Sequence, residues 1–67
     1  MEIFQAHLLE LRKKNHLTQP QVAEGVGITT RTYQRYEAGE REPNLSTLVA
    51  LAKFYNVSLD YLAGLEE

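Results

Sequence analysis

The sequence contains no cysteine, only two prolines and four glycines, and no long hydrophobic run. Without cysteine, the chain can form neither a disulfide nor a thiolate metal site. No apolar segment approaches the roughly 20 residues that cross a membrane. The start of the chain has Glu2 and no basic flank, unlike a secretory signal. We therefore expect a cytoplasmic protein without a membrane partner.

With 67 residues, the chain is expected to form a single domain over residues 1–67. Hydrophobic residues make up 43% and charged residues 24%, which is typical of a folded chain. No Ser/His/Asp or Cys/His set can be assembled for catalysis, so we expect no enzyme and no cofactor. His7 and Glu10 are three residues apart, but two potential ligands without a third do not predict a metal site.

The net charge of −2 is unevenly distributed along the chain. Acidic residues outnumber basic ones in residues 1–11 and 36–67. The segment 12–35 carries the single acid Glu24 and five basic residues: Arg12, Lys13, Lys14, Arg31 and Arg35. A basic segment can attract an anionic partner even when the whole chain is acidic.

Capping residues and glycines divide the chain into five segments, each with the hydrophobic spacing of a helix. Residues 2–14 form the first, and the later ones are capped by Thr18, Thr29, Asn44 and Ser58. Gly27, Gly39 and Gly64 are the expected stops. No segment alternates as a strand would, so the predicted fold is all-α.

Hydrophobic spacing also predicts which side chains face the interior. Tyr36 is expected to be partly exposed at its hydroxyl. The expected inner faces carry Phe4, Leu8, Leu11, Val22, Ala23, Val26, Tyr33, Tyr36, Leu45, Leu48, Leu51, Ala52, Tyr55, Leu59 and Leu62.

The two short segments around Gly27 predict a helix-turn-helix unit at about residues 19–37. Tyr33 and Tyr36 occupy the inner face of its second helix, Thr30 to Glu37. The projecting side chains are then Thr30, Arg31, Gln34 and Arg35. Arginine pairs with guanine, glutamine with adenine, and a threonine methyl contacts thymine. These residue types favour readout of the major groove.

From Leu11 to Leu62 the chain resembles the lambda-repressor-like, or Cro/Xre-type, family of helix-turn-helix regulators. The matching residues are Leu11-Arg12, Leu17-Thr18-Gln19, Val22-Ala23, Val26-Gly27-Ile28, Tyr33, Tyr36-Glu37, Gly39, Pro43, Leu48, Leu51-Ala52, Val57-Ser58-Leu59 and Asp60-Tyr61-Leu62. Two departures stand out. Glu40 and Glu42 occupy a loop that is frequently basic, and Gly25 replaces a longer residue.

The resemblance implies a compact five-helix DNA-binding domain that acts as a sequence-specific transcriptional regulator, expected to be a repressor. The helix from residue 30 to residue 37 would enter the major groove of double-stranded DNA. Base contacts are implied for Thr30, Arg31, Gln34 and Arg35. Phosphate contacts are implied for Gln19, Thr29, Thr32 and Arg41. Arg12 and Glu37 match an internal ion pair.

One recognition helix reads too few bases for useful specificity, so we expect a homodimer on an inverted-repeat operator. Phe54, Tyr61 and Leu65 have no assigned core role and are the candidate self-association residues. The alternative is a protein-interaction module, such as an antitoxin-like or anti-regulator partner with a vestigial helix-turn-helix. The acidic loop and the net charge of −2 would suit that alternative.

Overall fold

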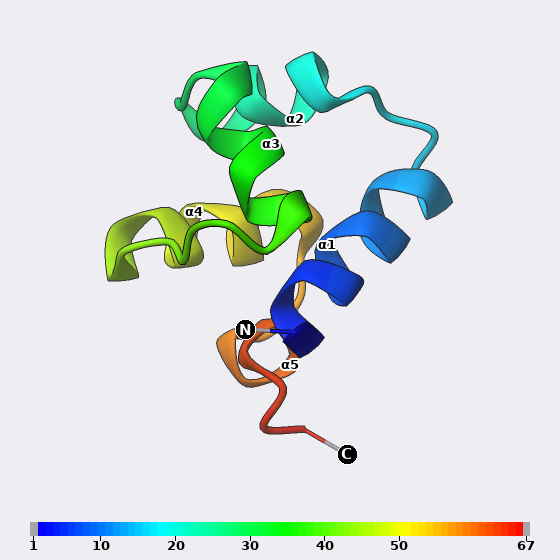
Figure 1. Cartoon of the computed structure of the whole chain (residues 1–67). Helices are drawn as coiled ribbons and strands as arrows, with labels where there is room; N and C mark the ends of the chain where they lie inside the picture. The colour runs from blue at the N-terminus through cyan, green and yellow to red at the C-terminus, as the bar shows by residue number, and fades with distance from the viewer. Residues whose placement is uncertain (1, 67) are drawn as a thin grey trace.

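The computed structural model describes residues 2–66, and over that range the chain forms five helices and no strand (Figure 1). The helices are α1 (Glu2–Lys14), α2 (Gln19–Val26), α3 (Thr30–Ala38), α4 (Leu45–Tyr55) and α5 (Leu59–Ala63). The prediction of an all-α, five-helix fold is confirmed. The third helix continues one residue beyond the expected Glu37, to Ala38.

Local hydrogen bonds explain why the helices begin where the sequence predicts. Thr18 and Gln21 form a capping box, in which the Thr18 hydroxyl accepts from the Gln21 N–H and the Gln21 amide oxygen accepts from the Thr18 N–H. Asn44 and Ser58 accept from the N–H three residues ahead in the same manner. These contacts depend only on neighbouring residues, so the sequence is sufficient to predict them.

The tight connection between α2 and α3 requires a left-handed residue at its first position. Gly27 has φ 77°, and its N–H donates to carbonyl oxygens in the last turn of α2. Ile28 follows, and Thr29 then caps α3. Because only three residues separate the helices, α2 and α3 must cross steeply and pack against each other.

A single hydrophobic core receives side chains from all five helices. The buried residues are Phe4, Leu8, Leu11, Val22, Ala23, Tyr33, Tyr36, Leu51, Ala52 and Leu62. Three expectations are wrong, and one of them concerns Leu59 at the start of α5, which is 38% exposed. Tyr36 is only 3% exposed, because its ring packs against the ring of Phe4. Leu45 is largely exposed, because the first turn of α4 extends beyond the core.

The helices place the helix-turn-helix unit at one end of the molecule. In Figure 1, α2 and α3 lie at the top, while the start of α1 and the short α5 lie together at the opposite end. Helix α4 packs against both α2 and α5. No helix within residues 2–66 is long and apolar enough to span a membrane.

The contact between α2 and α4 accounts for Gly25. Phe54 of α4 lies over this glycine, and a Cβ at residue 25 would collide with the edge of the Phe54 ring. A longer residue at this position is therefore incompatible with the present place of Phe54.

Candidate nucleic-acid interface

The first turn of α3 is held in place by the hydroxyl of its N-cap, Thr29. This hydroxyl accepts from the backbone N–H of Thr32 at 3.1 Å and donates to the Thr32 hydroxyl at 2.9 Å. Buried Tyr33 anchors the opposite side of the helix in the core. The outer side of the first turn is consequently fixed in position, with its free N–H groups at the positive end of the helix dipole.

The four residues predicted to contact bases all lie on the outward part of α3. Arg31 and Gln34 are exposed, while Thr30 and Arg35 are half-buried. Within residues 2–66, neither Arg31 nor Arg35 forms an ion pair with an acidic side chain. Helix α3 therefore presents two cations that the described part of the protein does not neutralise.

Arg12 and Glu37 form the single ion pair among residues 2–66 and join α1 to the end of α3. The guanidinium donates Nε to one carboxylate oxygen at 2.6 Å and Nη2 to the other at 3.0 Å. A third donor, Nη1, binds the carbonyl oxygen of Leu17 at 3.1 Å. The side chains are only 18% and 7% exposed, so the pair is well shielded from water.

The environment of Glu37 keeps its carboxylate ionised. Burial by itself would raise the pKa of Glu37, but hydrogen bonds from Arg12 and Gln19 outweigh this effect and lower the pKa from its ordinary value. The pKa of Arg12 is raised by the same pairing. Glu37 is therefore a charged hydrogen-bond acceptor at neutral pH.

Two glutamines extend this ion pair toward the surface. Gln19, at the start of α2, donates Nε2 to Glu37 Oε1 at 3.1 Å. Gln34 of α3 donates its Nε2 to Gln19 Oε1 at 3.2 Å. We refer to Arg12, Glu37, Gln19 and Gln34 as the polar network. Sequence reasoning missed the link between Gln19 and Gln34, because helical spacing contains no signal for a contact across 15 residues.

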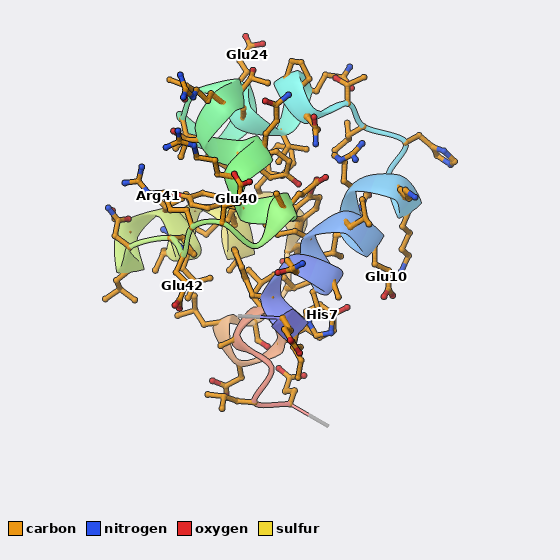
Figure 2. The ribbon with its side chains drawn as sticks, viewed as in Figure 1. His7, Glu10, Glu24, Glu40, Arg41 and Glu42 are labelled. Carbon is orange, nitrogen blue, oxygen red and sulfur yellow. The ribbon has the colours of Figure 1, made fainter. Side chains whose placement is uncertain are left out.

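The residues predicted to contact phosphates surround this face of α3. Gln19 is half-buried within the polar network, and Thr29 and Thr32 lie at the start of α3. Arg41 is exposed in the loop between α3 and α4, and Figure 2 shows its side chain pointing away from the body of the molecule. Glu42, in the same loop, points toward the α5 end.

The candidate self-association residues have different surroundings. Phe54 covers Gly25, and Tyr61 stacks on His7 with ring centroids 3.9 Å apart. Leu65 is 75% exposed. Ile3, which the sequence analysis did not single out, is also exposed and packs against Gly64. The exposed apolar residues at the α5 end thus include Ile3, Leu59 and Leu65, with Tyr61 half-buried.

Known proteins resemble this chain in both sequence and fold. The sequence model of the family described as helix-turn-helix matches residues 8–62. The uncharacterized HTH-type transcriptional regulator YobD of Bacillus subtilis is 47% identical over 60 residues, covering 90% of this chain and 54% of that protein. The cryptic phage CTXphi transcriptional repressor RstR of Vibrio cholerae is 39% identical over 62 residues, covering 92% and 56%.

A solved structure has the same arrangement of helices. The crystal structure of a transcriptional regulator from Listeria innocua aligns with a TM-score of 0.87 at 34% identity, covering 96% of this chain and 60% of that one. This chain spans about half the length of the curated relatives it matches.

Proposed function

This chain belongs to the Cro/Xre-type helix-turn-helix family, and we propose that it binds double-stranded DNA in a sequence-specific manner and regulates transcription. The observation that carries the proposal is the outer face of α3. It offers Arg31 and Arg35 without an acidic partner among residues 2–66. A molecule with a net charge of −2 thereby keeps a local positive surface that can meet DNA.

In this proposal α3 lies in the major groove and reads base edges from its outer side. Arg31 and Arg35 are suited to guanine, Gln34 to adenine, and the methyl group of Thr30 to thymine. Thr30 stands in the first turn of α3, next to the N-cap, so it is close to the end that would enter the groove.

Phosphate contacts would hold α3 in register along the groove. Gln19 has a second amide hydrogen left after its bond to Glu37, and Thr29 and Thr32 carry hydroxyls beside free N–H groups. Arg41 adds a cation from the loop that follows α3. These residues come from the start of α2, the start of α3 and the loop that follows α3, so they can reach the backbone on either side of a groove.

We further propose that the protein acts as a homodimer on an inverted repeat. The half-sites of such an operator lie about 34 Å apart, one turn of the duplex. The proposed self-association surface is the α5 end, where Ile3 at the start of α1 and Leu65 after α5 are exposed. This end lies opposite α2 and α3 in Figure 1.

Repression is the proposed outcome of binding. A protein bound at an operator can block access to a promoter sterically. Repression therefore needs no surface beyond the DNA-binding face. The relative RstR is described as a repressor. We place the protein in the cytoplasm, where bacterial DNA is found.

Selection of bound duplexes from a random DNA pool at near-physiological salt tests the proposal. The expected result is a short two-fold symmetric sequence whose affinity falls steeply as salt rises. Failure to enrich any sequence would contradict it. Binding to a protein partner with little salt dependence would instead favour the interaction-module alternative.

A further inference from the structure

The end of α1 carries basic side chains that the proposed function does not use. Lys13 and Lys14 lie in the last turn of α1, and His16 follows in the connection to α2. All three side chains are exposed. Within residues 2–66 neither lysine forms an ion pair, even with Glu10 on the same helix. We refer to Lys13, Lys14 and His16 as the α1-end cluster.

The α1-end cluster lies next to the start of α2, where Gln19 is a proposed phosphate contact. Arg12 fixes this connection, since its guanidinium donates to the carbonyl oxygen of Leu17 at 3.1 Å. The same guanidinium binds Glu37, which also accepts from Gln19. The α1–α2 connection and the turn into α3 are at opposite ends of α2 (Figure 1). A contact between the cluster and DNA would therefore fall outside the bases that α3 reads.

The backbone of His16 is left-handed, with φ 56°. Its N–H donates to the carbonyl oxygen of Lys13, and the N–H of Leu17 donates to that of Arg12. Gly27 ends α2 with the same pair of hydrogen bonds. Glycine adopts this conformation without strain, whereas a residue with a Cβ is strained. Local structure alone therefore favours glycine at residue 16, and the imidazole is kept there at a conformational cost.

The side chains of the α1-end cluster suit phosphate groups. A lysine ammonium is a compact charge on a long flexible stem. An imidazole always carries at least one N–H, which can donate to a phosphate oxygen. The phosphates of each strand follow one another about every 3.4 Å along the duplex axis. A cluster beside one contacted phosphate is consequently close to the next ones along the same strand.

We propose that the α1-end cluster is a second DNA-binding surface, which contacts backbone phosphates outside the half-site that α3 reads. This inference rests on the proposed DNA binding. It extends the surface that each copy covers toward the flank of the operator. Phosphate contacts carry no direct sequence information, so the cluster adds affinity without changing the base preference.

Salt titration of the affinity for the selected operator, measured by fluorescence anisotropy, tests the two lysines. Lys13→Ala and Lys14→Ala should each lower the slope of log affinity against log salt by about one, since each removes a phosphate contact. The loss of affinity between about 50 and about 200 mM salt should be about tenfold smaller in the double variant than in the wild type. Lys53→Ala is the matched control, because it removes an exposed lysine near the end of α4. Its slope should equal that of the wild type.

His16→Gly separates DNA contact from stability. Glycine relieves the left-handed backbone, so the midpoint temperature of unfolding should not fall. The affinity for the operator should nevertheless fall by about 2- to 12-fold, the equivalent of one net hydrogen bond. Asn56→Gly makes the same exchange at another left-handed residue, with φ 55°, at the end of α4. This control should keep the wild-type affinity.

Duplexes with neutral methylphosphonate groups locate the contact. Replacing the phosphates just outside each half-site should weaken binding of the wild type, because the lysines then lose their charged partners. The same replacement should weaken the Lys13→Ala/Lys14→Ala double variant much less, since the two changes remove one interaction. Replacing phosphates within the half-site should weaken both proteins equally.

Four results would overturn the inference. These are a wild-type salt slope in the double lysine variant, an equal change of slope in Lys53→Ala, flanking methylphosphonates that weaken the wild type and the double variant equally, and wild-type affinity in His16→Gly. Each can occur while the wild type still binds a specific sequence, in which case the proposed function stands. A wild type without any sequence preference would instead overturn the proposed function itself.

Discussion

Arg31 and Arg41 are both exposed arginines, but the proposed binding mode gives them different tasks on DNA. Arg31 lies in the first turn of α3, from which the proposed binding mode has it contact base edges. Arg31→Ala is expected to weaken binding to the selected duplex by about 1–3 kcal/mol and to relax the preference at one base position. Repeating the random-pool selection with the variant measures both effects. An unchanged preference would contradict the base-reading role.

Arg41→Ala serves as the comparison, because Arg41 is assigned to a phosphate from a loop. Its loss is expected to weaken all duplexes about equally and to lower the slope of log affinity against log salt by about one. A selective loss at one base pair would show that the loop lies deeper in the groove than proposed.

Glu37 makes the stability of the fold sensitive to acid. Its pKa is lowered in the folded state, so its contribution is complete above the ordinary value of 4.5 and is lost as the pH falls through the lower folded pKa. Glu37→Gln cannot titrate, and it exchanges a charged acceptor for a neutral one. We expect it to cost roughly 1.5–3 kcal/mol at neutral pH and to flatten the acid side of the stability profile.

Urea unfolding at a series of pH values measures this effect. The difference between wild type and Glu37→Gln should shrink as the pH falls. If the free energies of unfolding of the two proteins, plotted against pH, remain parallel down to low pH, the Arg12–Glu37 pair does not supply the acid dependence.

At the scale of the element, the start of α3 combines a structural cap with the proposed surface for DNA. Aspartate is as good an N-cap as threonine and also suits the positive end of the helix. Thr29→Asp is therefore expected to leave the free energy of unfolding unchanged or slightly raised. Its carboxylate would face a phosphate, so DNA affinity should fall at least about tenfold at low salt.

Ser58→Asp is the matched control for this variant. Ser58 caps α5 with the same geometry, but α5 lies at the end of the molecule away from α3. Equal losses of DNA affinity in the two variants would indicate a general charge effect and contradict the placement of α3 on the DNA.

The elements were predictable from the sequence to the extent that their signals are local. Thr18, Thr29 and Gly27 act on neighbouring residues, so the limits of α2 and the start of α3 follow from chemistry within a few positions. The exposure of Leu45 was not predictable, because it depends on how far α4 extends beyond the core. The burial of Tyr36 depends likewise on Phe4, 32 positions away in the chain.

The candidate site likewise has one part that the sequence predicts and one part that it does not. Periodicity places Thr30, Arg31, Gln34 and Arg35 on one side of α3, since the core side is fixed by Tyr33. The hydrogen bond between Gln34 and Gln19 depends on the crossing of two helices and on an amide orientation imposed by a third residue, Glu37. Tertiary geometry decides such a contact, and residue spacing does not encode it.

At the scale of the whole molecule, the separation of two surfaces matters more than the total charge. Helix α3, which carries Arg31 and Arg35, lies at one end in Figure 1, and the start of α1 and helix α5 lie at the other. Ile3 and Leu65, which belong to that second end by their place in the chain, are exposed. The proposed binding to DNA would therefore not compete with the proposed self-association at the α5 end. In the proposed complex, an acidic total of −2 would also limit nonspecific attraction to DNA, so that affinity would come mainly from the α3 face.

A rigid pair of such molecules makes the distance between half-sites a strict requirement. With two α3 helices held about 34 Å apart, both reach the same side of the duplex only when the half-sites are about one turn apart. Inserting about 5 base pairs turns the second half-site to the opposite side and should reduce affinity toward that of a single half-site. Gel shift measurements with the selected operator and its insertion variants give the comparison.

Leu65→Asp should produce the same reduction on the uninterrupted operator, because an ionised carboxylate is costly to bury in an apolar contact. If the insertion changes neither the affinity of the wild type nor that of Leu65→Asp, the two copies bind without contacting each other.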